Sequence, residues 1–122
     1  MRRLVDTIYG SLAIDEGERL VYFTRTAEVF PDHEAAREFV DAVLMAVSPY
    51  GGQNYAVLSD VRAAVGVRDK ELEAILKELR VEFVTGFRAV ALVVRTAAGQ
   101  LQSDRFRREM NDEVCVFRDE QD

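Results

Sequence analysis

The sequence has one cysteine, one histidine and no apolar run long enough to cross a bilayer. A single cysteine, Cys115, excludes a disulfide within the chain and is typical of a reducing compartment. A single histidine, His33, with no cysteine near it, offers no set of metal ligands. The residues after Met1 lack the hydrophobic region of a secretory signal. We therefore expect a cytoplasmic protein with no metal, no cofactor and no segment inserted in a membrane.

Positive charge is also scarce, because 16 lysines and arginines stand against 22 aspartates and glutamates, which gives a net charge of −6. An acidic domain repels phosphate backbones, so this composition argues against nucleic acid as a partner. The 122 residues are 48% hydrophobic and 31% charged. Those proportions indicate one ordered domain, spanning residues 1–122, with a single core.

The longest apolar stretch lies within Phe87 to Thr96 (FRAVALVVRT), where no side chain from Ala89 to Val94 is polar. It is rich in valine, as are strands that are covered on both sides. The pattern therefore predicts that this segment is the central strand of a sheet, buried on both faces.

Near the beginning of the chain, apolar and polar residues alternate from Thr7 to Ile14, which is the period of a half-buried strand. A second strand is predicted from Arg19 to Arg25. The segment between them, with Gly17, is typical of a tight turn. These two strands should form a hairpin.

Helical spacing of apolar residues predicts two helices, one capped by Asp32 and ended at Pro49, the other capped by Asp69 and ended at Gly86. Together with the hairpin, they predict an α/β fold with a mixed sheet of about five strands, in which strand–helix units follow the hairpin. The remaining predicted elements are strands at Tyr55 to Ser59 and Glu113 to Phe117 and a weaker helix at Gln100 to Met110.

Short motifs stand at the ends of the predicted strands. They are Tyr55 to Arg62 (YAVLSDVR), Val93 to Thr96 (VVRT), Gly99 to Gln102 (GQLQ) leading to Arg105, and Val116 to Glu120 (VFRDE). With the order of elements, they resemble the STAS domains, the SpoIIAA-like fold of anti-sigma factor antagonists, and more narrowly bacterial proteins described as STAS/SEC14 domain-containing. The resemblance covers nearly the whole chain.

This resemblance implies a non-enzymatic module for regulatory protein–protein interaction. In antagonists of this family, a phosphorylatable serine or threonine directly follows the aspartate at the end of the third strand. Here Val61 follows Asp60, and Ser59 precedes it. The sequence therefore predicts a module without that phosphorylation switch.

The relatives also continue past the last strand into a helix that covers the sheet, whereas this sequence ends at Asp122. The segment Val114 to Phe117 is apolar on both sides and needs cover, and a twofold dimer is the commonest way to provide it. We therefore expect a homodimer. In the alternative arrangement, the residues from Asp119 onward fold back as a polar tail and the first helix covers the strand.

The candidate site combines the ends of two predicted strands. If the strands that end near Asp60 and Arg95 are parallel, then Asp60, Arg62, Arg95 and Thr96 meet at one edge of the sheet, where ligands of open α/β sheets bind. Asp60 and Arg95 could form an ion pair that holds the loops, or the group could be a binding surface. A basic cluster at Arg105 could bind an anionic partner or belong to an ordinary surface helix. The predicted partner-binding residues are Asp60, Val61, Arg62, Arg95, Thr96 and Arg105.

Three functions remain open from the residues and the resemblance. The first is the regulatory interaction module, binding a protein around Asp60 to Val67 and the following helix. The second is a small-molecule or lipid-binding domain, as the SEC14 side of the resemblance implies, and the third is a purely structural dimer subunit. A preformed apolar cavity would favour the second, and a filled core with a flat apolar patch would favour the first.

Overall fold

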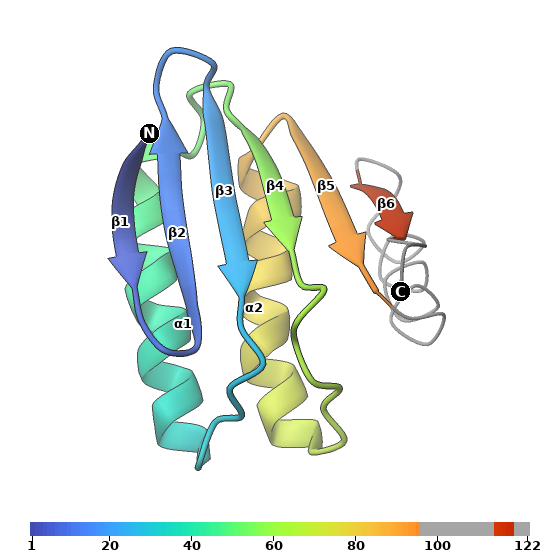
Figure 1. The fold of residues 1–122 in the computed structure, drawn as a ribbon. Coiled ribbons are helices and arrows are strands. Elements are labelled where there is room, and N and C mark those ends of the chain that lie inside the picture. Colours follow the sequence, from blue (N-terminus) through green and yellow to red (C-terminus); the bar gives the residue numbers. More distant parts are fainter. Residues whose placement is uncertain (96–113, 119–122) are drawn as a thin grey trace.

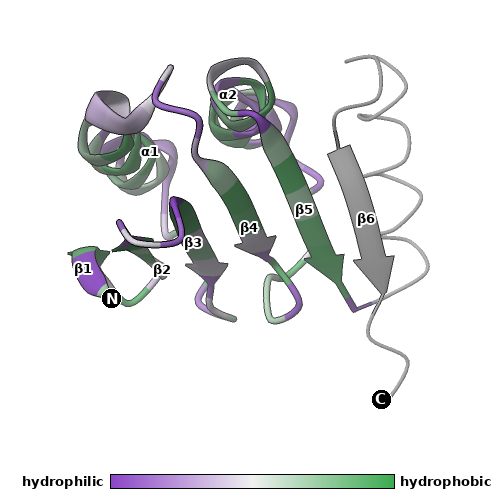
Figure 2. Ribbon diagram, turned by 90° about the horizontal axis from the view of Figure 1, so that it is seen from above, coloured by the Kyte–Doolittle hydropathy of each residue, from purple (hydrophilic) through white to green (hydrophobic). Residues whose placement is uncertain are grey.

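The computed structural model describes residues 1–95 and the strand 114–118. These residues form one mixed β-sheet with two long helices on the same side of it (Figures 1 and 2). The strands are β1 (Arg2–Asp6), β2 (Gly10–Asp15), β3 (Leu20–Arg25), β4 (Ala56–Asp60), β5 (Ala89–Val94) and β6 (Val114–Arg118). The helices are α1 (His33–Val47), a short 3-10 turn η1 (Ser48–Tyr50), and α2 (Lys70–Gly86).

The six strands lie in sequence order across the sheet. The predicted hairpin is confirmed, because β2 and β3 pair antiparallel, and β3 through β6 then run parallel to one another. The prediction of about five strands missed β1, which pairs antiparallel with β2. The sequence pattern hid this strand because only Leu4 and Val5 in it are apolar, and its register with β2 shifts between Arg3 and Val5.

The prediction for the apolar segment of β5 was wrong in two respects. The strand lies fifth of six, next to β6, so β3 and β4 hold the centre of the sheet. It is also not buried on both faces: Val90, Leu92 and Val94 point toward the helices and are buried, whereas Ala89 is exposed and the side chains between them are half-buried. A short apolar run cannot reveal this difference, because the helices cover one face of the sheet and the run carries no polar side chain to mark the other.

Both helices begin where the sequence predicted. The Asp32 carboxylate accepts a hydrogen bond from the backbone N–H of Ala35 at 2.8 Å, and Asp69 accepts from Glu71 and Leu72 at 2.9 and 3.2 Å. None of the helices in the described ranges combines the length and apolar character needed to cross a membrane.

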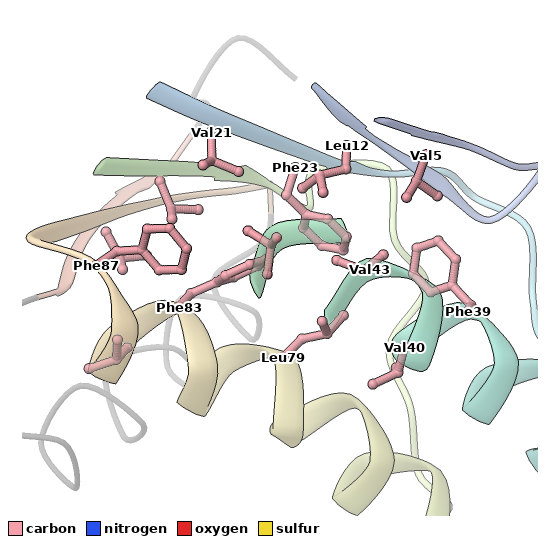
Figure 3. Close-up of a cluster of buried hydrophobic side chains, with 14 of the residues drawn as sticks. Val5, Leu12, Val21, Phe23, Phe39, Val40, Val43, Leu79, Phe83 and Phe87 are labelled. Carbon is pink, nitrogen blue, oxygen red and sulfur yellow. The ribbon is translucent and has the colours of Figure 1, made fainter. Parts of the chain in front are cut away.

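The core lies between the helices and the sheet face that they cover (Figure 3). Strand register places buried side chains side by side across the sheet, as in the row Leu12–Phe23–Ser59–Leu92. Phe23 contacts Phe83 of α2, with ring centroids 5.4 Å apart. The helices supply the opposing layer with Ala36, Phe39, Val40, Val43, Val47, Leu79, Phe83 and Val84.

His33 joins the beginnings of the two helices. Its Nε2 lies 2.7 Å from Asp69 Oδ2 and its Nδ1 lies 2.6 Å from Glu71 Oε2. The hydrogen bond with Asp69, followed by the charges of both carboxylates, raises the pKa of His33 above its ordinary 6.5. The same hydrogen bond lowers the pKa of Asp69 below 3.8. The protonated imidazole therefore bridges two acidic side chains.

We expect this bridge to make stability depend on pH in a defined direction. Because the folded-state pKa of His33 lies above 6.5, its contribution is fully present below pH 6.5 and is lost as the pH rises through that pKa. The melting temperature of the wild type should exceed that of His33→Gln by a small amount between about pH 4 and 6.5, and the difference should close at higher pH. Thermal unfolding of both proteins measures it, and a difference that stays constant to pH 9 would contradict the bridge.

Candidate functional site: a pocket at the carboxyl edge of the sheet

A pocket of about 260 Å³ lies at the edge where the parallel strands β3, β4 and β5 end. Its walls come from these strand ends, from the segment 61–67 that follows β4, and from α2 between Glu73 and Phe83. The described residues that line it are Phe23, Arg25, Ser59, Val61, Arg62, Ala64, Val65, Gly66, Val67, Glu73, Leu76, Leu79, Arg80, Phe83, Leu92, Val94 and Arg95.

The pocket exists because α2 begins beyond the end of the sheet (Figure 1). Leu79, Phe83 and Val84 in its second half are buried, whereas Leu72 and Leu76 in its first half are only half-buried. The segment between β4 and α2 closes the remaining side. It is tied to the sheet where the backbone N–H of Val61 donates to the carbonyl of Val93 at 3.0 Å.

Asp60 and Arg62 form an ion pair at the rim. Arg62 Nη2 lies 2.8 Å from Asp60 Oδ2, and its Nε and backbone N–H both donate to Asp60 Oδ1. The hydrogen bonds from the Arg62 side chain hold the pKa of Asp60 below its ordinary value. Among the described residues, the ion-pair partner of Asp60 is therefore Arg62, and the interpretation in which Asp60 pairs with Arg95 was wrong. A contact two residues along the chain costs less ordering than one between two strands.

Arg80 and Glu73, two further charged residues of the lining, form an ion pair along α2. Arg80 Nη2 donates a hydrogen bond to Glu73 Oε1. Arg25, at the end of β3, is held differently. Its Nε donates to the carbonyl of Tyr9 at 3.1 Å, and its guanidinium carbon lies 4.8 Å from the ring centre of Phe30 and 5.7 Å from that of Phe39.

Ser59 is a buried polar residue, 3% exposed, and it points from β4 toward the helix layer. Within residues 1–95 and 114–118 its hydroxyl has no hydrogen-bond partner. In the same residues, every side-chain oxygen or nitrogen that is fully enclosed has a partner, so the Ser59 hydroxyl is not fully enclosed. The hydroxyl of Ser59 is therefore accessible from the pocket that it lines. A kinase cannot reach so buried a residue unless this end of β4 leaves the sheet.

The structure brings most of the predicted site residues together. Val61, Arg62 and Arg95 line the pocket, and Asp60 positions Arg62. Thr96, Arg105 and the predicted helix Gln100 to Met110 lie outside the described residues.

Sequence reasoning missed Arg25, Glu73 and Arg80. The signal for Arg25 was present, because it ends a third strand that runs parallel to the two already considered. The two residues of α2 carried no such signal, since on a charged helix their positions resemble any solvated face.

Comparison of the chain with protein-family models, with curated proteins and with solved structures found no significant match to any of them. In the parts of the chain that the structure describes, no group of three or more histidine, cysteine or acidic side chains is arranged to hold a metal ion.

Proposed function

We propose that this protein is a non-enzymatic regulatory domain that binds a small molecule in the pocket at the carboxyl edge of the sheet. The observation that carries the proposal is the preformed pocket of about 260 Å³, whose buried lining is mainly apolar and includes Phe23, Leu79, Phe83 and Leu92. Binding sites of open α/β sheets lie at this edge. The volume is close to the lower end of the range for small-molecule sites, roughly 300 Å³, which suits a small ligand.

The lining favours binding over catalysis. Ser59, the one serine among the described lining residues, has no hydrogen-bonded base there, and the acidic Glu73 is engaged by Arg80. A nucleophile without a base or a stabilising charge beside it is weak. The resemblance to STAS and SEC14-like domains supports the same class of function, a regulatory domain that responds to what it binds.

Binding of N-phenyl-1-naphthylamine, a neutral apolar dye that fluoresces in apolar sites, tests this function. We expect saturable binding of one dye per chain and a loss of about tenfold or more in Leu76→Trp, where a larger side chain enters the pocket from α2. The matched control is Met45→Trp, because Met45 is 79% exposed on α1 and does not line the pocket.

Either of two results would contradict the function. One is the absence of saturable dye binding by the wild type. The other is equal binding by Leu76→Trp and Met45→Trp, since the dye would then occupy some other surface.

A second candidate function is protein binding by the segment after β4, which the exposed Val65 favours. Val65 is 56% exposed beside Gly66, so the segment that lines the pocket also presents an apolar side chain to solvent. Pull-down with wild type and Val65→Asp as baits decides it: a protein retained equally by both does not bind there.

A further inference from the structure

The charge of the pocket differs from that of the chain. The protein as a whole carries −6, yet the charged residues that line this site within the described ranges are four arginines and one glutamate. Arg62 and Arg80 have carboxylate partners in Asp60 and Glu73. Arg25 differs from these two arginines, because none of the described carboxylates pairs with it.

Arg25 is half-buried, and no carboxylate among the described residues lies within ion-pair distance of it. Its interactions with described residues are the hydrogen bond from Nε to the Tyr9 carbonyl and the contacts with the rings of Phe30 and Phe39. The terminal nitrogens Nη1 and Nη2 therefore remain available. Partial burial lowers the pKa of Arg25, although a guanidinium stays charged at any physiological pH.

The surroundings of Arg25 fix the guanidinium in place. Gly10 lies opposite Arg25 in the β2–β3 register, and the absence of a side chain there lets the Phe39 ring come close to the strand. Phe39 and Phe30 then support the guanidinium, and the Tyr9 carbonyl sets its orientation. A positioned cation that is partly removed from water, with two unused donor groups, is matched by an anion that approaches through the pocket.

We infer that the ligand of this pocket is a small amphipathic anion, with carboxylate or phosphate oxygens bound by Arg25 and an apolar body against Phe23, Leu76 and Phe83. The inference rests on the proposed function, and it adds the chemical class of the ligand. The accessible hydroxyl of Ser59 supplies a second, uncharged hydrogen-bonding group in the same pocket. An alkyl or aryl acid combines the two features that the lining presents.

Displacement of N-phenyl-1-naphthylamine from the full chain by three octyl compounds tests this inference. Octanoate, octyl phosphate and octan-1-ol share one apolar body and differ in the polar group. We expect one or both anions to bind roughly 10- to 100-fold more tightly than the alcohol, the range expected for a hydrogen bond between charged groups. The stronger of the two anions identifies carboxylate or phosphate as the preferred group.

The variant Arg25→Gln should remove that preference, because it keeps a polar side chain and loses the charge. Arg88→Gln is the matched control: Nε of Arg88 also donates to a backbone carbonyl, that of Asn54 at 3.1 Å, but Arg88 precedes β5 at the opposite end of the sheet. We expect the anions to bind Arg25→Gln no more tightly than octan-1-ol, and to bind Arg88→Gln as they bind the wild type. The affinity for octan-1-ol should change less than about twofold in both variants.

The outcomes separate this inference from the proposed function. If the dye and octan-1-ol bind but the anions bind no more tightly than the alcohol, the inference is wrong and the proposed function stands. The same conclusion follows if Arg25→Gln keeps the anion preference. If the dye binds in the pocket but neither anion displaces it, the inference alone is wrong. If the wild type shows no saturable binding of the dye, both fail. Should Arg25→Gln not fold, the comparison of the three compounds on the wild type still decides the inference.

Discussion

Val90→Asp is expected to abolish soluble expression. Val90 is 3% exposed and lies on the helix-facing side of β5, in a row with Ile14, Val21 and Val57 of the neighbouring strands. A carboxylate placed there loses its hydration, and none of the neighbouring side chains in this row carries a positive charge that could compensate for the loss. The cost is several kcal/mol, which is comparable to the roughly 5–15 kcal/mol that stabilises a whole domain.

The neighbouring residue provides a matched control for this prediction. Ala89 lies one position earlier in the same strand, faces the opposite side of the sheet and is exposed. Ala89→Asp should therefore fold, with a melting temperature within a few degrees of the wild type. Soluble yield and thermal unfolding by circular dichroism measure both variants. If Val90→Asp melts close to the wild type, β5 does not bury this face and the core described above is wrong.

Gly10→Ala is expected to destabilise the protein by about 3 kcal/mol, which lowers the melting temperature by roughly 10 °C or more. A Cβ at position 10 would lie 2.4 Å from the carbonyl oxygen of Thr24 and 3.0 Å from Cζ of Phe39. The first contact is with the backbone of β3, which can move only if the β2–β3 pairing opens. The glycine is therefore required by space, and any side chain must distort the hairpin.

Gly17→Ala is the control for that substitution, because Gly17 lies in the turn of the same hairpin. The nearest atom to a Cβ at position 17 is Oδ1 of Asp15, at 3.5 Å, which is an ordinary contact. We expect its melting temperature to stay within a few degrees of the wild type. If thermal unfolding shows equal effects for the two alanines, Gly10 is not the point at which β2, β3 and α1 meet.

Much of the fold could be predicted from the sequence because local signals are strong where they occur. Asp32 and Asp69 cap their helices through contacts with the next few residues, so their role does not depend on distant parts of the chain. The period-two alternation before Gly17, the turn at Gly17 and the strand predicted after it likewise indicated the hairpin. The weak signal of β1 is the exception, since a strand with two apolar residues gains its stability from the neighbour that it pairs with.

The candidate site was predictable only in its position. Parallel strands place their carboxyl ends at one edge, and this reasoning correctly brought Asp60, Arg62 and Arg95 to the same region. It did not give the partner of Asp60, because several arginines are near enough and the choice depends on side-chain geometry. The same reasoning did not predict the cavity, because a cavity is the space that side chains leave when helices and strands of fixed length pack together.

The sequence alone therefore determined the kinds of elements, their caps and the edge at which a site should lie, because each depends on neighbours along the chain. Tertiary structure decided that β5 lies away from the centre, that both helices cover one face, and that α2 begins beyond the sheet. It also decided that Arg25 lies over Phe30 and Phe39 with Tyr9 as its carbonyl partner. These contacts join residues 5 to 16 positions apart in different segments of the chain, and their energies appear only when those segments pack together.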